Sequence, residues 1–284
     1  MKLFRHGPVG KEKPGVILEN GDKVDASGFG GDFDESFFGD NGLEKLRQWV
    51  GREAARAPRV AEGVRLGSVV ARPSKLICIG LNYIDHAKET NAEIPSEPVI
   101  FLKATTALCG PNDDVLIPRN SKKTDWEVEL GVVIGRKTKY VPEEKALEHV
   151  AGFCLHNDYS EREFQLERKG QWVKGKSCYT FAPLGPYLAT VDEVPDFQDL
   201  GMWLTVNGKF MQKSNTANMI YKVPFLVSYL SQFMTLLPGD VISTGTPSGV
   251  GMGRKPPLFL KPGDLVELGI DKLGQSKQKA VQEA

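Results

Sequence analysis

The sequence has few of the residues that cross-link small proteins or bind zinc. Its cysteines, Cys78, Cys109, Cys154 and Cys178, lie singly along 284 residues, without the close pairs that zinc sites and redox motifs require. A chain of this length buries enough apolar surface to fold without disulfides or a structural metal. We therefore expect the cysteines to be reduced thiols in the core.

The sequence also lacks an excess of charge and a long apolar run. Lysine plus arginine and aspartate plus glutamate both number 36, so no net field draws the protein to nucleic acid or to an anionic membrane. No apolar stretch approaches the roughly 20 residues that span a bilayer, and the opening MKLFRHG has no signal-peptide core. We expect a cytoplasmic protein with a small-molecule partner, and neither a nucleic-acid nor a membrane partner.

The sequence pattern changes near residue 70, which predicts a small N-terminal domain, residues 1–70, and a larger catalytic domain, residues 71–284. In the first, Asn20 and Gly21 predict a hairpin turn. Apolar residues at helical spacing predict a helix over 43–57. We expect this short region to pack on the larger domain.

Short segments rich in β-branched and aromatic residues dominate the larger domain. They are KLICIG, PVIFLK, WEVELGVVIG, VAGFCL, GMWLTVNGKFMQK and DVIST, and Asn207 with Gly208 predicts a hairpin inside one of them. Helical patterns are few, at about 83–90, 160–169 and 218–232, so a doubly wound parallel sheet is the poorer interpretation. The sequence predicts an α+β fold dominated by strands.

One predicted strand, TDWEVELGVVIG, alternates strictly between acidic and apolar residues. Because alternate side chains of a strand share a face, Asp125, Glu127 and Glu129 should project from one surface. Two carboxylates about 6 Å apart repel by about 3 kcal/mol at an effective dielectric near 20, so a partly enclosed cluster favours a bound cation. A solvated acidic face on an amphipathic strand is an equally good interpretation of this segment alone.

A further carboxylate follows the apolar strand VAGFCL. Asp158 comes where that strand stops, and loops at strand ends are where catalytic groups concentrate. It could converge with Glu127 and Glu129. Three oxygen ligands suit a hard divalent cation, Mg²⁺ or Mn²⁺, since no close cysteine or histidine pair is available for zinc.

Among the four histidines, His86 stands out. It follows the strand KLICIG on a short predicted helix, where Glu89 lies one turn away and could orient the imidazole for activating a water molecule. A surface ion pair is the commoner meaning of this spacing. Structural or surface roles are expected of His6, His149 and His156.

The segment after Asp158 predicts a helix start, with Ser160 and Glu163 at the spacing of a capping box. Arg162 and Gln165 then lie three apart on one helical face, close to the proposed cation. An arginine there could bind a substrate carboxylate through two hydrogen bonds. A solvated helix face is the alternative, and this segment alone favours it.

Residues 170–177, GQWVKGKS, match the phosphate-loop pattern literally and would make the protein a nucleotide hydrolase. The surroundings are wrong, because no buried strand precedes the match and no helix is expected after it. Trp172 and Val173 would also hinder a tight backbone loop. We reject the loop but keep Lys176, whose ammonium group could meet a substrate oxygen.

Taken together, these residues resemble the fumarylacetoacetate hydrolase family from about Lys75 to Gly274. The resemblance lies in LNYIDHAKE, EPVIFLK, DWEVELGVVIG, NDYSEREFQ, WVKGKS and GDVISTGTPSGVG. It implies a mixed β-roll, a homodimer and one divalent cation per subunit, Mg²⁺ or Mn²⁺. The residues it implies are Glu127, Glu129 and Asp158 for the metal, His86 and Glu89 for water activation, and Arg162, Gln165, Lys176 and Thr246 for contacts to substrate or enolate.

The opening LFRHGPVGKEKPGVI resembles that of longer bacterial members of the family. Among these are ureidoglycolate lyases and hydrolases of 2,4-diketo-3-deoxy sugar acids derived from L-rhamnonate or L-fuconate. We therefore expect hydrolysis of a C–C bond in a 2,4-diketo acid, giving pyruvate and a second acid. A lyase or oxaloacetate decarboxylase that uses the same site is the alternative within the family, and a metal-bound scaffold without turnover is a third class.

Overall fold

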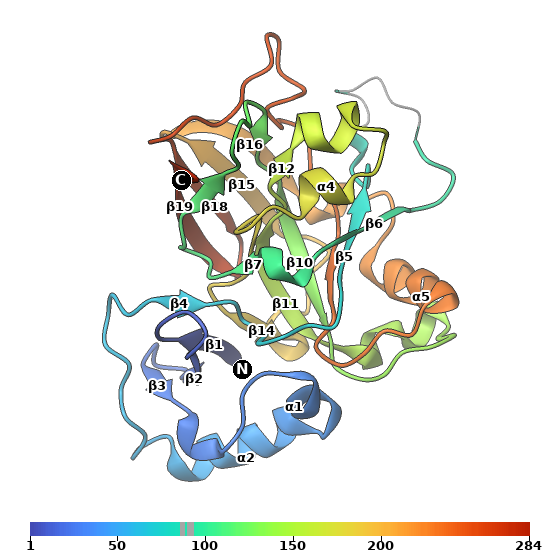
Figure 1. Cartoon of the computed structure of the whole chain (residues 1–284). Coiled ribbons are helices and arrows are strands. Elements are labelled where there is room, and N and C mark those ends of the chain that lie inside the picture. Colours follow the sequence, from blue (N-terminus) through green and yellow to red (C-terminus); the bar gives the residue numbers. More distant parts are fainter. Residues whose placement is uncertain (86–88, 90–93) are drawn as a thin grey trace.

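Two antiparallel, fully buried strands form the centre of the fold (Figure 1). They are β10 (Val128–Ile134) and β11 (Val150–Asn157), and their pairing begins with Val128 opposite Asn157. Both are nearly continuous apolar runs, as expected of strands that are covered on both faces. The computed structural model describes every residue of the chain except 86–88 and 90–93.

These two strands belong to a ten-stranded sheet with the order β3-β2-β1-β14-β11-β10-β17-β5-β6, and β4 pairs with β1. Its pairs are antiparallel apart from β17 with β5, so the sheet is mixed. The other strands are β1 (Lys2–His6), β2 (Lys13–Ile17), β3 (Lys23–Asp25), β4 (Leu66–Gly67), β5 (Leu76–Gly80), β6 (Val99–Lys103), β14 (Leu188–Thr190) and β17 (Val241–Ser243).

A second sheet of five strands has the order β16-β15-β18-β19-β8. Its members are β8 (Val115–Ile117), β15 (Gly201–Val206), β16 (Lys209–Asn215), β18 (Leu265–Ile270) and β19 (Gly274–Gln282). The predicted hairpin at Asn207 and Gly208 is confirmed: both residues have positive φ, at 51° and 75°, as a tight two-residue turn requires. The predicted strand-dominated α+β fold is confirmed with it.

Short elements complete the structure. Two small sheets pair β9 (Thr124–Asp125) with β12 (Ser160–Glu161) and β7 (Leu108–Cys109) with β13 (Ala182–Pro183). The helices are α1 (Glu35–Gly39), α2 (Gly42–Glu53), α4 (Val173–Lys176) and α5 (Val223–Phe233), with a π-helical turn at Glu163–Glu167. Within the described part of the chain, no helix has the length and apolar character needed to cross a membrane.

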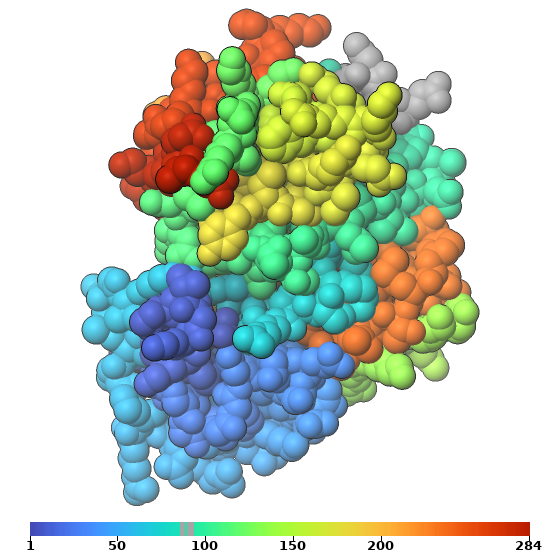
Figure 2. Space-filling view, in the orientation of Figure 1, coloured from blue at the N-terminus to red at the C-terminus, as the bar shows by residue number. Residues whose placement is uncertain are grey.

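The N-terminal residues form a lobe at one end of the molecule, drawn in blue (Figure 2). β1 pairs with β14, with Lys2 opposite Ala189, so the strands of this lobe extend the sheet of the larger part. An ion pair between Arg65 and Asp113 adds a second link, and the hydrogen bond to that carboxylate raises the pKa of Arg65. Main-chain pairing of β1 with β14 therefore joins the two parts. The domain boundary near residue 70 stays a prediction.

The segment after Asp158 differs from the predicted helix over 160–169. Ser160 lies in β12 opposite Asp125, and its hydroxyl donates to the carbonyl of Asp158, so the expected capping box does not form. The helical part is the π-helical turn Glu163–Glu167, with Arg162 already in helical conformation before it. Pairing with β9 is a tertiary contact that local helix signals do not report, and it holds the start of this segment extended.

A glycine in β11 tests the close packing of the central strands. A Cβ on Gly152 would lie 2.1 Å from the carbonyl oxygen of Ala189, so Gly152→Ala must displace backbone. We expect it to lower the free energy of unfolding by roughly 1–3 kcal/mol, measured by urea titration.

Gly51→Ala is the matched control, because Gly51 is exposed in α2 and a Cβ there meets no atom within 4 Å. It should raise the free energy of unfolding by up to about 1 kcal/mol. Equal stability of the two variants would contradict the close approach of β11 and β14.

Candidate metal centre and active site

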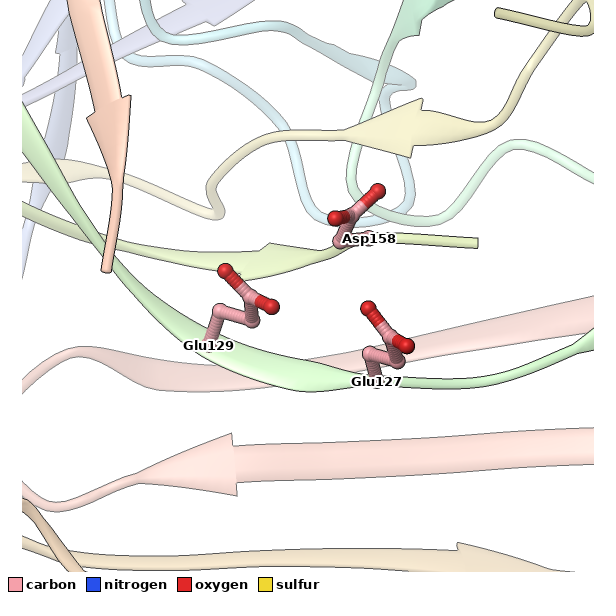
Figure 3. A group of neighbouring side chains, drawn as sticks. All are labelled: Glu127, Glu129 and Asp158. Atoms are coloured by element: carbon pink, nitrogen blue, oxygen red, sulfur yellow. The ribbon is translucent and has the colours of Figure 1, made fainter. Parts of the chain in front are cut away.

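Three buried carboxylates, those of Glu127, Glu129 and Asp158, point toward one another beside the central strand pair (Figure 3). One oxygen of each lies within 4.8 Å of those of the others. Because β10 and β11 are antiparallel, the start of one strand lies beside the end of the other, and the backbone N–H of Asp158 donates to the carbonyl of Glu127 at 2.9 Å. The main-chain ladder thus brings together carboxylates that are about thirty positions apart in the sequence.

Burial makes this arrangement unstable without a counter-charge. Burial raises the pKa of Glu129 well above its usual range, and the negative charges of Asp158 and Glu127 add to the effect. Burial also acts to raise the pKa of Asp158, but the ammonium groups of Lys103 and Lys176 outweigh it and lower that pKa. Glu129 is therefore the carboxylate from which a bound cation would displace a proton.

Two lysines neutralise part of the cluster. Lys176, on α4, donates to Glu127 at 2.6 Å and to Asp158 at 2.8 Å. Lys103, the last residue of β6, donates to the other oxygen of Asp158 and to the carbonyl of Tyr159. Lys176 was expected here from the sequence and Lys103 was not, although a lysine closing the apolar strand PVIFLK was a usable signal.

Arg162 joins the cluster to a fourth carboxylate. Its guanidinium donates to Asp125 at 2.8 Å, to Glu127 at 2.6 Å and to the side-chain oxygen of Gln165 at 3.0 Å. Asp125 also accepts from the backbone of the turn at 251–252. The predicted shared face of the acidic residues is thus present, but Asp125 positions Arg162 and this turn and is outside the group of three.

The Ser243 hydroxyl orients Glu129, and the His156 imidazole orients that hydroxyl. Ser243 on β17 donates to Oε2 of Glu129, which also accepts from the backbone N–H of Gly245 at 2.9 Å. The Ser243 oxygen lies 2.6 Å from Nδ1 of His156, and burial lowers the pKa of His156 to about 3, so the ring is neutral. With the hydroxyl donating to Glu129, Nδ1 must carry the proton that the hydroxyl oxygen accepts.

Both of these hydrogen bonds end on Oε2 of Glu129. Its Oε1 has no hydrogen-bond donor among the described residues and is free to bind a cation. From the sequence, only a structural or surface role was expected of His156. No sequence signal connects Ser243 to Glu129, because they are 114 residues apart and meet only through the pairing of β10 with β17.

Counting the charges of the described site shows what it can accept. Four carboxylates, those of Asp125, Glu127, Glu129 and Asp158, face three cationic groups, those of Lys103, Arg162 and Lys176. When all are ionised, one negative charge is in excess. A divalent cation would reverse this to one positive charge within this group of seven, which does not include Glu89.

The proposed catalytic dyad is described only at Glu89, since His86 lies outside the described residues. Both carboxylate oxygens of Glu89 accept from the backbone N–H of Gly249, at 3.1 and 3.0 Å. Gly249 has a φ of 103°, and a Cβ there would lie 2.0 Å from the carbonyl oxygen of Met211, so this position needs glycine. The GTPSGVG loop is thereby joined to Glu89.

Thr246 of the same loop lies on the cavity wall. Its hydroxyl donates to the carbonyl of Val128 at 3.0 Å and accepts from Gln212 at 2.8 Å. The cavity holds about 190 Å³ and borders Glu127 and Glu129. Its other lining residues are Ile79, Gly80, Leu81, Phe101, Arg162, Gln165, Leu166, Trp172, Lys176, Thr246 and Met252.

Comparison with known proteins identifies the family to which a chain with these site residues belongs. The model of the fumarylacetoacetate (FAA) hydrolase C-terminal domain matches residues 75–281, which include every residue of the cluster. The chain belongs to the fumarylacetoacetate hydrolase family. The resemblance seen in the sequence is therefore confirmed.

Three similar proteins match this family member over nearly its whole length. A Burkholderia ambifaria protein, described provisionally as a hydrolase, is 54% identical over 279 residues, 98% of each chain. The fumarylacetoacetate hydrolase of psychrophilic Exiguobacterium antarcticum is 33% identical, with a TM-score of 0.87 and 100% of both chains covered. The maleylpyruvate hydrolase of Sphingobium sp. SYK-6, solved with manganese(II) and pyruvate, is 29% identical, with a TM-score of 0.83 and 100% of both chains covered.

The donor set of this family member fits a hard divalent cation. Its candidate ligands are all carboxylate oxygens, the ligands that Mg²⁺ and Mn²⁺ prefer. The Ser243 hydroxyl orients one of these ligands, and such supporting hydrogen bonds tune metal affinity.

Ser243→Ala tests that support. Removing the hydroxyl frees Glu129 to rotate, so the affinity for Mn²⁺ should fall by roughly 10- to 100-fold, measured by isothermal titration calorimetry. Ser228→Ala is the control. Ser228 lies on α5, outside the site, and its half-buried hydroxyl donates to the carbonyl of Val141. Unchanged Mn²⁺ affinity in Ser243→Ala would remove the supporting role of the hydroxyl.

Proposed function

We propose that the protein hydrolyses the C–C bond of an acylpyruvate-type 2,4-diketo acid, giving pyruvate and a second acid. The observation that carries this proposal is the buried group of Glu127, Glu129 and Asp158 beside a small cavity that Arg162 and Lys176 also line. Membership of a hydrolase family supports it, as does a neighbour solved with manganese and pyruvate.

We propose that Glu127, Glu129 and Asp158 bind one Mg²⁺ or Mn²⁺ per subunit. When bound, such a cation would supply Lewis-acid polarisation at the keto-acid end of the substrate. The raised pKa of Glu129 predicts that binding releases a proton.

Arg162 and Gln165 are placed to bind the substrate carboxylate. The three bonds that the guanidinium makes to Asp125, Glu127 and Gln165 leave N–H groups over. These N–H groups could donate to a carboxylate while the existing bonds hold the guanidinium in place. Arg162 is thereby preorganised, which reduces the entropy that binding costs.

We assign the proton transfers to His86 and the orientation of its ring to Glu89. The imidazole takes a proton from water as the water oxygen bonds to C4 of the substrate. The C3–C4 bond then breaks, and its electron pair passes to the pyruvate enolate. Return of the proton to C3 gives pyruvate, while the acyl group leaves as a carboxylic acid.

Lys176 and Thr246 complete the proposed site. The Lys176 ammonium uses two N–H groups on Glu127 and Asp158, so a third can donate to the enolate oxygen as negative charge develops there. The Thr246 hydroxyl is already hydrogen-bonded on the wall of the cavity, so we assign it a substrate contact only.

For the natural substrate we propose a 2,4-diketo-3-deoxy sugar acid, such as the derivative of L-rhamnonate or L-fuconate, with lactate as the second acid. The resemblance of the N-terminal region to the hydrolases of those acids supports this choice. A homodimer and a cytoplasmic location remain predictions.

A ureidoglycolate lyase or an oxaloacetate decarboxylase is the alternative, since either would use the same site without attack by water, and loss of carbon dioxide from oxaloacetate would leave the same pyruvate enolate. The nucleotide-hydrolase interpretation is disfavoured, because Lys176 is buried and paired with two carboxylates and α4 after Trp172 spans four residues only. Nucleotide binding in the presence of Mg²⁺ that depends on Lys176 would revive it.

A panel of acylpyruvates and 2,4-diketo sugar acids, followed by ¹H NMR of the products, tests the proposal. Protein supplied with Mg²⁺ or Mn²⁺ should release pyruvate and a carboxylic acid, and excess chelator should abolish the release. His86→Ala should lower kcat by roughly 10²- to 10⁴-fold, because a general base is lost, while Mn²⁺ affinity is kept.

The control for this assay is the product pattern. Ureidoglycolate and oxaloacetate are assayed in the same way, and release of glyoxylate with urea from the first, or of carbon dioxide with pyruvate from the second, in place of acylpyruvate cleavage would assign the lyase or decarboxylase alternative. Full activity of His86→Ala with the cation bound would show that another group activates the water.

A further inference from the structure

Away from the carboxylates, the wall of the cavity is apolar. Its side chains there are Ile79, Leu81, Phe101, Leu166, Trp172 and Met252. In an acylpyruvate the keto-acid end would lie at the charged residues, so the acyl group must meet this wall.

Trp172 holds a fixed place in the wall. Its ring meets that of Phe101 edge to face, with centroids 5.2 Å apart. It also packs on the backbone of Gly80, where an added Cβ would lie 2.9 Å from the indole. The ammonium group of Lys176 lies 4.8 Å from the centre of the Phe101 ring, so this apolar wall adjoins the charged end of the cavity directly.

Within the described residues, the wall has no partner for a second substrate carboxylate. Arg162 and Lys176 are the cations that line the cavity, and both already pair with carboxylates of the protein. Arg254 donates to the carbonyl of Met211 and is absent from the lining. A carboxylate against Trp172 would lose part of its hydration without gaining a hydrogen bond from a described residue of the wall.

The charge count leads to the same conclusion. With a divalent cation bound, one positive charge remains among those four carboxylates and three cationic groups, and the carboxylate of Glu89 or of the keto-acid end neutralises it. A second carboxylate would be in excess. The cavity, at about 190 Å³, is also smaller than the roughly 300–1,000 Å³ typical of sites for drug-sized ligands.

We propose that the substrate of this protein carries a short, uncharged acyl group, and that Trp172 limits its length. This inference rests on the proposed acylpyruvate hydrolysis and narrows it. It separates the protein from the Sphingobium neighbour, which is named for maleylpyruvate, because a maleyl group has a second carboxylate. The lactyl group of the proposed sugar-acid derivatives is uncharged and meets the requirement.

The test compares kcat/KM for acetylpyruvate, hexanoylpyruvate and maleylpyruvate on the full chain with Mn²⁺. Acetylpyruvate should exceed maleylpyruvate by at least about tenfold, a difference of roughly 1.4 kcal/mol in transition-state binding. Leu166→Arg would add a guanidinium at the rim, where the leucine is 44% exposed. It should shift the ratio toward maleylpyruvate by about tenfold or more.

Val173→Arg is the matched control, since Val173 is 42% exposed nearby on α4 but does not line the cavity. It should leave the ratio at the wild-type value. Trp172→Phe should raise the rate with hexanoylpyruvate relative to acetylpyruvate, because the smaller ring leaves more room.

The outcomes separate this inference from the proposed function. Pyruvate release from none of the acylpyruvates overturns both. Efficient release with maleylpyruvate preferred overturns the uncharged acyl group alone. An unchanged hexanoyl-to-acetyl ratio in an active Trp172→Phe variant overturns the role of Trp172 in limiting length.

Discussion

The mutual repulsion of three buried carboxylates is the constraint on which the site depends. The pairing of β10 with β11 fixes the backbone positions of Glu127, Glu129 and Asp158, so their side-chain oxygens lie within 4.8 Å of one another. Lysines and an arginine relieve part of the repulsion, and Ser243 fixes the orientation of Glu129. The divalent cation proposed above would supply further counter-charge.

Much of this was open to prediction, because it follows from periodicity. The alternation in TDWEVELGVVIG places the acidic side chains on one face, and Asp158 follows the apolar run that ends β11. Antiparallel pairing of these two strands is enough to bring the carboxylates together. The hairpin at Asn207 and Gly208 was equally local, since its turn demands residues that tolerate positive φ.

The parts that escaped prediction depend on contacts between distant segments. Lys103 reaches Asp158 across 55 residues, and the link from His156 through Ser243 to Glu129 requires both β11 and β17. The helix expected over 160–169 was shortened by the pairing of Ser160 with Asp125, which local helix signals cannot report. Sequence periodicity defined the carboxylate face, while the groups that support it were set by the topology of the sheet.

A crystal of the protein soaked in MnCl₂, with anomalous diffraction recorded above the manganese edge, tests the central claim most directly. One anomalous peak per chain should appear between the side chains of Glu127, Glu129 and Asp158, and Asp158→Asn should weaken or remove it. A peak elsewhere, or no peak with the lysine ammonium groups still neutralising the three carboxylates, would contradict the shared cation.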